Sequence, residues 1–317
     1  MSWSVDDVPD LAGRVAVVTG ANGGLGFETA RVLVRKGARV VMAVRSPEKG
    51  GRARASILGE MPGAALEVVT LDTSSLASVH DAAATITALH DRIDILVNNA
   101  GVMGIPRRES ADGHELQLAI SHLGHFALTA LLMPALLRSD RGRVVSLTSL
   151  ARLFGRPIDP DDVAMHRRYD PWLAYGRAKL AVVQFTVALD RRLVASGASV
   201  RALAADPGFS GTDLQAASAR EAGGRSQRLA ARTVRWFGSS PATGALPQIR
   251  CAIDPDASGG CLYGLRFAVR GAPARQPYLV PWLRSQDLRA LWAVSERETG
   301  VRFDVAALVR AGGQPPA

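Results

Sequence analysis

The chain has 317 residues, 47% of them hydrophobic, which is enough for a large folded core. Its formal net charge of +9 would suit a nucleic acid or a membrane surface, but the basic residues are mostly scattered, so neither partner is expected. Because the first residues are acidic and no uninterrupted apolar run reaches about 18 residues, we expect a cytoplasmic protein without stable membrane insertion.

The pattern of apolar residues predicts strands that alternate with helices. Six short β-branched runs predict buried strands, at residues 15–18, 39–44, 66–71, 93–97, 143–147 and 198–204. Helices are predicted at residues 27–36, 47–58, 75–89, 115–137, 171–195, 241–253 and 286–299. This order predicts an α/β fold with a doubly wound parallel sheet, the Rossmann fold. We expect one domain at residues 11–303, an N-terminal extension at 1–10 and a C-terminal tail at 304–317.

The segment 209–240 interrupts this alternation after the sixth strand. It is rich in arginine, alanine and glycine and follows a strand at the expected ligand edge, so it is predicted to be a lid; a surface excursion without a role is the alternative. Five arginines lie in it, at positions 220, 225, 228, 232 and 235. No aromatic residue stands between them, so we expect a solvated helix face rather than a surface for nucleic acid.

A glycine-rich loop follows the first strand. Gly20, Gly23, Gly24 and Gly26 stand within seven residues, directly before an amphipathic helix. Backbone N–H groups and the helix dipole can approach an anionic pyrophosphate there, because no side chain intervenes. The loop is therefore predicted to cradle phosphates, although such turns also occur for packing alone. The candidates for cofactor binding in it are Gly20, Asn22, Gly24, Leu25 and Gly26.

Tyr175 and Lys179 stand four residues apart in the helix predicted at 171–195. Residues at this spacing share one helix face, so their polar ends can meet. A phenol has an ordinary pKa of about 10, and a neighbouring ammonium group is expected to lower this pKa. Since the chain has only four tyrosines and three lysines, a chance pair is rare. The pair is predicted to carry acid–base chemistry.

These features together resemble the short-chain dehydrogenase/reductase family, and most closely its branch with the retinol dehydrogenases. The resemblance spans residues 11–303. It rests on Thr19-Gly20-x-x-x-Gly24-x-Gly26, Asn98-Asn99-Ala100-Gly101, Tyr175-x-x-x-Lys179 and Pro207-Gly208. It implies an oxidoreductase that interconverts a carbonyl and an alcohol by hydride transfer with a nicotinamide cofactor.

The resemblance also implies roles for individual residues. Tyr175 would be the general acid in reduction and the general base in oxidation. Lys179 would lower the pKa of Tyr175 and bind the nicotinamide ribose, and Ser149 would hold the substrate oxygen, with Ser146 and Thr148 as alternatives. Further candidates are Asp72 and Thr73 near the adenine, Asn99, Ala100 and Gly101 near its ribose, and Pro207, Gly208 and Thr212 near the nicotinamide.

One position departs from the family pattern. Ser121 stands where the family has an asparagine that anchors a water leading from the lysine toward solvent. The substitution indicates an altered proton relay. It also leaves a second function as an alternative, namely a nucleotide-binding protein with altered or non-redox activity, such as a cyclase, an isomerase or a regulator. His122 and His125 follow, but without a nearby third ligand they are expected to pack in a helix, and no metal site is predicted.

Arg45, at the end of the second strand, predicts NADP(H) as the cofactor. NAD enzymes place an acidic residue there for the ribose hydroxyls, whereas no acid precedes Glu48 in this segment. A guanidinium group suits a 2′-phosphate. Arg52 and Arg54 follow in the next predicted helix.

The expected substrate is a fairly apolar small molecule with a carbonyl or an alcohol. This expectation rests on the resemblance to the retinol dehydrogenase branch and on aromatic residues near the predicted lid, namely Phe154, Trp172, Phe209 and Trp236. Members of the family commonly pair through two long helices. A homodimer or homotetramer is therefore expected, through segments 115–137 and 171–195.

Overall fold

A computed structural model of the chain describes residues 3–208, 239–268 and 270–312. Most of the predicted lid lies outside the described residues, and so do Thr212, Phe209, Trp236 and the arginines at 220–235.

The described residues form one eight-stranded sheet in the order β3-β2-β1-β4-β5-β6-β7-β8. Its strands are β1 Val15–Thr19, β2 Arg39–Val44, β3 Leu66–Thr70, β4 Ile95–Asn98, β5 Arg143–Leu147, β6 Arg201–Asp206, β7 Leu262–Leu265 and β8 Pro273–Gln276. All neighbours pair in parallel except β7 and β8. The first three strands are added outward from β1 in one direction, and the strands from β4 onward are added in the other. This order confirms the doubly wound Rossmann fold.

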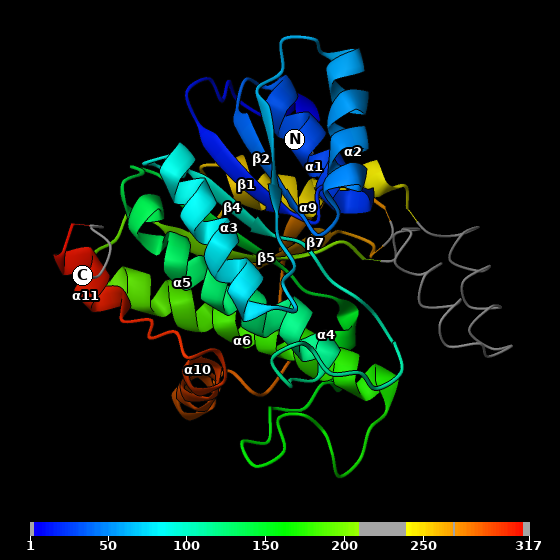
Figure 1. Cartoon of the computed structure of the whole chain (residues 1–317), viewed down its shortest axis with the longest axis vertical. Coiled ribbons are helices and arrows are strands. Elements are labelled where there is room, and N and C mark those ends of the chain that lie inside the picture. The colour runs from blue at the N-terminus through cyan, green and yellow to red at the C-terminus, as the bar shows by residue number, and fades with distance from the viewer. Residues whose placement is uncertain (1–2, 209–238, 269, 313–317) are drawn as a thin grey trace, which may run out of the picture.

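Helices cover both faces of this sheet (Figure 1). The longer ones are α1 Gly24–Arg35, α2 Pro47–Glu60, α3 Leu76–Leu89, α5 Gly124–Leu137, α6 Pro171–Ala195, α9 Pro241–Ile253 and α10 Ser285–Thr299. The short ones are η1 Val5–Asp7, α4 Leu116–Leu118, η2 Ala119–Leu123, η3 Leu150–Phe154 and α11 Val305–Arg310. One buried cluster joins the sheet to α3, α5, α6 and α10, and the second joins it to α1, α2 and α9.

Two strands exist that the apolar pattern does not predict. β7 has four residues, including Gly264, and β8 starts with a proline and carries Arg275 and Gln276. β7 is buried but too short, and interrupted by Gly264, to give an apolar run, and β8 is polar because it forms the antiparallel edge of the sheet. The prediction of six strands was therefore incomplete at this edge.

The helix predicted at 115–137 contains an irregular turn. A single π-helical turn, η2, separates α4 from α5 and includes Ser121 and His122. π-turns of this kind inside α-helices occur frequently at functional sites. Apolar periodicity does not reveal such a turn, since all five of its residues are buried.

The C-terminal segment packs on the two long helices. Phe303 and Val305 are buried in the same cluster as α5 and α6, and the Arg192 guanidinium of α6 lies 3.8 Å from the ring centroid of Trp292 in α10. Asp304 caps α11 by accepting a hydrogen bond from the Ala307 N–H. The segment expected as a tail thus contains a helix that covers part of α5 and α6 (Figure 1).

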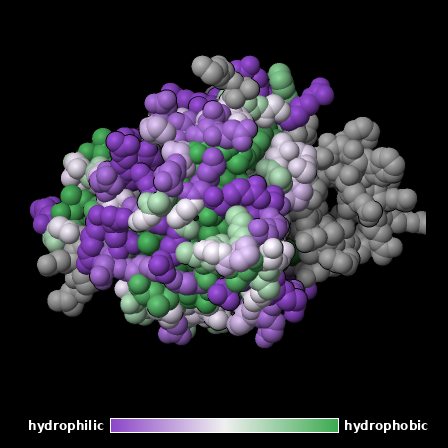
Figure 2. Space-filling model, turned by 90° about the horizontal axis from the view of Figure 1, so that it is seen from above, coloured by the Kyte–Doolittle hydropathy of each residue, from purple (hydrophilic) through white to green (hydrophobic). Residues whose placement is uncertain are grey.

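Within the described residues, Leu116–Leu137 is the one helical segment long and apolar enough to cross a membrane. The protein itself buries 89% of its most apolar window, as expected for a core helix. The face seen in Figure 2 is mainly hydrophilic, with smaller apolar patches between the polar residues.

We predict that Gly124→Ala destabilises the protein by about 1–3 kcal/mol, because the new Cβ would overlap the Thr73 carbonyl. That close approach sets α5 against the end of β3. Urea denaturation measures the loss. Gly59→Ala is the matched control: it also lies in a helix but meets no atom within 4 Å, so it should gain up to about 1 kcal/mol. Equal stability of the two variants would contradict the prediction.

Candidate functional site

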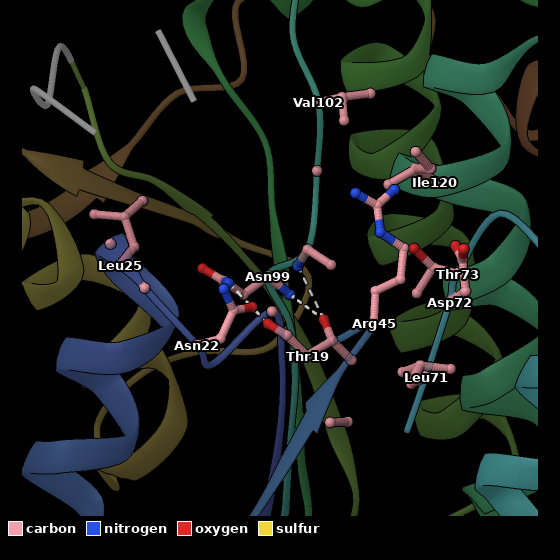
Figure 3. Close-up of a pocket in the computed structure, with 16 residues that line it drawn as sticks. Thr19, Asn22, Leu25, Arg45, Leu71, Asp72, Thr73, Asn99, Val102 and Ile120 are labelled. Carbon is pink, nitrogen blue, oxygen red and sulfur yellow. Dashed lines mark hydrogen bonds between the residues drawn. The ribbon is translucent and has the colours of Figure 1, made fainter. Parts of the chain in front are cut away.

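A pocket lies at the carboxyl ends of β1, β2 and β4 and extends beside the segment that follows β3 (Figure 3). Ligands of doubly wound sheets bind at such an edge, where the strand order reverses. Most of the predicted cofactor residues line the pocket: Gly20, Asn22, Gly24, Leu25, Arg45, Asp72, Thr73, Asn99, Ala100 and Gly101. Gly26 lies directly behind its wall.

The glycines of the loop are required by close backbone contacts. Gly20 has φ +68°, and a Cβ there would lie 3.1 Å from the Ala100 Cα atom. A Cβ on Gly26 would lie 2.5 Å from the Gly20 carbonyl oxygen and from the Asn99 side chain. The loop therefore presents bare backbone at the start of α1, at the place where the sequence analysis expects a phosphate cradle.

Thr19, at the end of β1, joins the walls of the pocket. Its hydroxyl oxygen accepts hydrogen bonds from the N–H groups of Asn99 and Ala100, both at 2.9 Å, and lies 2.9 Å from Nε2 of His125. The Asn99 side chain donates to the Thr19 carbonyl at 2.8 Å (Figure 3). This role of Thr19 was not predicted, although its place at the end of a strand and directly before the glycine loop was visible in the sequence.

Arg45 stands at the end of β2, across the pocket from Asn22 and Leu25 (Figure 3). Its side chain is exposed, and it has no hydrogen-bond or ion-pair partner among the described residues. An unpaired cation at this rim can receive an anionic group. Asp72 is partly engaged, because its Oδ1 accepts hydrogen bonds from the N–H and hydroxyl of Ser74, at 2.9 and 2.6 Å.

The structure brings Ser149, Tyr175 and Lys179 together behind the pocket. Ser149 caps η3 after β5, and its hydroxyl lies close enough to the Tyr175 phenol to act on the pKa of that phenol. Lys179 Nζ lies 5.7 Å from the centroid of the Tyr175 ring and donates to the Leu147 carbonyl at 2.9 Å. Both side chains are almost fully buried in α6.

The two alternatives to Ser149 have other partners. The Thr148 hydroxyl donates to the Lys179 carbonyl at 2.8 Å, and the Ser146 hydroxyl accepts from the Asn98 side chain at 3.4 Å. Both are buried. Ser149 is therefore the hydroxyl that faces the phenol.

The prediction that Lys179 lowers the pKa of Tyr175 below its ordinary value is wrong for the protein without a bound cofactor. Burial raises the pKa of Tyr175 to about 12, against the opposing effect of the Ser149 hydroxyl, and the Asp206 carboxylate raises it further. Burial also lowers the pKa of Lys179 to about 8, while Asp206 acts in the other direction. Desolvation outweighs the attraction of a single ammonium group, because both groups lie away from water.

Ser121 faces the same point as Lys179. A Cβ built on Gly101 would lie 3.6 Å from Lys179 Nζ and 3.9 Å from Ser121 Oγ. Within the part of the chain that the structure describes, the buried Ser121 hydroxyl has no hydrogen-bond partner. The π-turn thus places a buried hydroxyl next to Gly101, the pocket residue that Lys179 also approaches.

His122 and His125 point to different partners. His122 Nε2 lies 2.7 Å from the Ser295 hydroxyl, whereas His125 contacts Thr19. Burial lowers their pKa values to about 3 and about 4, so both imidazoles are neutral near pH 7. Among the described residues, no group of three or more His, Cys, Asp or Glu side chains could hold a metal ion.

Pro207 and Gly208 follow β6 at the same edge. The Gly208 N–H donates to Asp206 Oδ1 at 2.9 Å, and Gly208 has φ +66°, with the Ala268 carbonyl where a Cβ would stand. Asp206 also forms a buried ion pair with Arg152 of η3. Both residues of this pair were missed; Asp206 was visible as a charge at a strand end, whereas nothing in the sequence marks Arg152.

Comparison with known proteins identifies the family. The family model for short chain dehydrogenases matches residues 14–223. Retinol dehydrogenase 13 of Homo sapiens is 38% identical over 300 residues, which cover 92% of this chain and 86% of that protein. Polyprenol dehydrogenase of Mus musculus is 40% identical over 299 residues, with the same two coverages.

Solved structures also support membership of this family. The crystal structure of an uncharacterised protein from Mycobacterium paratuberculosis is 38% identical, with a TM-score of 0.79, and the match covers 96% of this chain and 99% of that one. A structure from Beutenbergia cavernae, described as an NAD(P)-dependent gluconate 5-dehydrogenase with bound NADP, is 27% identical, with a TM-score of 0.62 and coverages of 80% and 96%. The chain therefore belongs to the short-chain dehydrogenase/reductase family of oxidoreductases, in its retinol dehydrogenase-like branch.

Proposed function

We propose that the protein is an NADP(H)-dependent oxidoreductase that interconverts a carbonyl and an alcohol on a fairly apolar small molecule. The observation that carries this proposal is the position of Gly101 between the pocket and Lys179. Gly101 lines the pocket that starts at the glycine loop, and a Cβ built on it would lie 3.6 Å from Lys179 Nζ. A ligand held at the loop would therefore end close to Lys179 and its helix neighbour Tyr175.

The cofactor, when bound, supplies or accepts the hydride. The chain supplies the proton. Tyr175, with its pKa raised to about 12, is a neutral phenol near pH 7 and can donate a proton to a carbonyl oxygen held by the Ser149 hydroxyl. The alkoxide that forms is a far stronger base than a phenolate, so this transfer is downhill. In oxidation the same phenol must first lose its proton, which favours reduction in the free protein.

The preference for NADP(H) rests on Arg45. Its exposed guanidinium at the pocket rim has no partner among the described residues, and a 2′-phosphate would give it two charge-assisted hydrogen bonds. Asp72 and Thr73 line the same end of the pocket, where an adenine would lie.

The apolar substrate class rests on side chains beside Tyr175. Leu153, Phe154, Trp172 and Leu173 are 39–48% exposed, and the Trp172 and Tyr175 rings meet edge to face with centroids 6.3 Å apart. Exposed apolar side chains grouped at a site indicate an apolar ligand.

The expected homodimer or homotetramer and the cytoplasmic location stay predictions. The part of α5 and α6 that α10 and α11 cover is not available for pairing.

Tyr175→Phe is expected to lower the turnover of a ketone or aldehyde with NADPH by about 10²- to 10⁴-fold, because it removes the proton donor. The dissociation constant for NADPH should change little. Absorbance assays and NADPH fluorescence titrations measure the two quantities. Tyr263→Phe, whose phenol bonds among the described residues to the Ser258 N–H alone, is the matched control and should retain activity. Unchanged turnover in Tyr175→Phe would refute the assignment.

Arg45→Ala is expected to weaken NADPH binding about tenfold or more, the loss of one charge-assisted contact of about 1.5–3 kcal/mol, and to leave NADH binding unchanged. Titration of the variant with both nucleotides tests this. Arg289→Ala, which removes an exposed arginine from α10, is the control. A parallel loss for both nucleotides would show that Arg45 does not read the 2′-phosphate.

Ser121→Ala is expected to slow reductive turnover by about tenfold, because it removes the hydroxyl that faces Lys179. Ser121→Asn, which restores the family's residue, should be at least as active as the wild type. Thr186→Val removes a buried hydroxyl that donates to the Val182 carbonyl in the same helix, α6, and serves as the control. Full activity of Ser121→Ala excludes Ser121 from the proton path. NADPH binding without turnover of any carbonyl by the wild type would favour the non-redox alternative.

A further inference from the structure

The buried pair of Arg152 and Asp206 lies beside the catalytic centre without belonging to it. The two side chains are 2% and 4% exposed. Arg152 belongs to η3, which begins directly after Ser149, and Asp206 ends β6, directly before Pro207. Taking two charges out of water is costly, so the pair contributes little net stability compared with apolar side chains of similar size. A role other than stability is therefore worth testing.

Arg152 and Asp206 are each hydrogen-bonded to the backbone on one side of the catalytic centre. Arg152 donates from Nη1 to the Ser149 carbonyl at 3.0 Å and from Nε to the Tyr278 carbonyl at 3.4 Å. Asp206 accepts the Gly208 N–H at 2.9 Å through one carboxylate oxygen and binds Arg152 through the other. The pair thus ties the backbone of Ser149 to the Pro207-Gly208 turn, across the ends of β5 and β6.

Asp206 is also the charge that acts on both proton-carrying groups. Its carboxylate raises the pKa of Tyr175 and opposes the lowering of the Lys179 pKa by burial. The other titratable group that faces Lys179 is His125 of α5, and its imidazole is neutral at working pH because burial lowers its pKa to about 4. From η3, the charge that approaches is Arg152, already paired with Asp206.

We propose that Arg152 and Asp206 are positioning residues: their ion pair fixes the backbone of Ser149 relative to the Pro207-Gly208 turn. The Asp206 carboxylate in addition favours the protonated states of Tyr175 and Lys179. This inference rests on the proposed function for its catalytic meaning, whereas its electrostatic part concerns the protein alone.

Asp206→Asn tests the proposal, because an asparagine oxygen can still accept the Gly208 N–H while the negative charge is lost. Arg152 then remains as an unpaired cation, so Tyr175 and Lys179 both lose protons at lower pH. The alkaline limb of kcat/KM for carbonyl reduction, expected near the Lys179 pKa of about 8, should move about one pH unit lower. NADPH affinity at neutral pH should change less than kcat.

A second variant guards against misfolding. Arg152→Gln combined with Asp206→Asn removes both charges and leaves no buried cation without a partner. It should fold, and its alkaline limb should move in the same direction as in Asp206→Asn, by a smaller amount. Asp190→Asn is the matched control, since Asp190 pairs with Arg201 at the opposite end of β6, at 2.9 Å. This control is expected to cost stability and to leave the pH profile unchanged.

Tyrosinate absorbance of the protein without nucleotide separates this proposal from the proposed function. The signal that disappears with Tyr175→Phe should titrate at lower pH in Asp206→Asn and in the double variant, whether or not any carbonyl is reduced. Pair variants that fold and show the wild-type titration and pH profile would overturn the proposal and leave the pair a structural one. Failure of the wild type to turn over NADPH would instead count against the proposed function alone.

Discussion

The hydroxyl of Thr19 is the contact on which the site depends most. It accepts two backbone N–H groups from the end of β4 and meets His125 of α5, so it joins three elements at the point where the strand order reverses. The glycine loop can lie close to Asn99 and Ala100 only because these contacts hold the two strand ends together. Both the cradle and the wall formed by Gly101 follow from this arrangement.

The second constraint is burial of charge. Tyr175, Lys179, Asp206 and Arg152 lie together out of water, where desolvation decides which protonation state each titrating group prefers. A neutral phenol and a lysine with a pKa near 8 are what a proton donor for reduction requires. The same apolar surroundings make each partner sensitive to the loss of another, because an unpaired buried charge is expensive.

Local patterns in the sequence predict those parts of the protein that depend on neighbouring residues. The glycine loop, the central strands and the spacing of Tyr175 and Lys179 are of this kind, and the structure places them as expected. Contacts between distant segments leave no such pattern. Arg152 meets Asp206 across 54 positions, and Thr19 meets His125 across 106.

The remaining differences also have physical reasons. The π-turn at Ser121 could not be predicted from the apolar pattern. All five of its residues are buried, and a buried α-helical turn would give the same pattern. The edge strand β8 is polar because one of its sides is unpaired. The raised pKa of Tyr175 could not be predicted from its spacing to Lys179. The spacing shows that the two side chains are neighbours, but the pKa depends mainly on how deeply the phenol is buried.

We propose that this site moves a hydride and a proton between NADPH and a carbonyl group. The most direct test is to incubate the protein with NADPH carrying deuterium at the transferable nicotinamide position and with a series of apolar aldehydes and ketones, and to analyse the alcohols by mass spectrometry. The proposed hydride transfer predicts an alcohol with one deuterium on its carbinol carbon. Tight NADPH binding without deuterated alcohol from any of these compounds would contradict it.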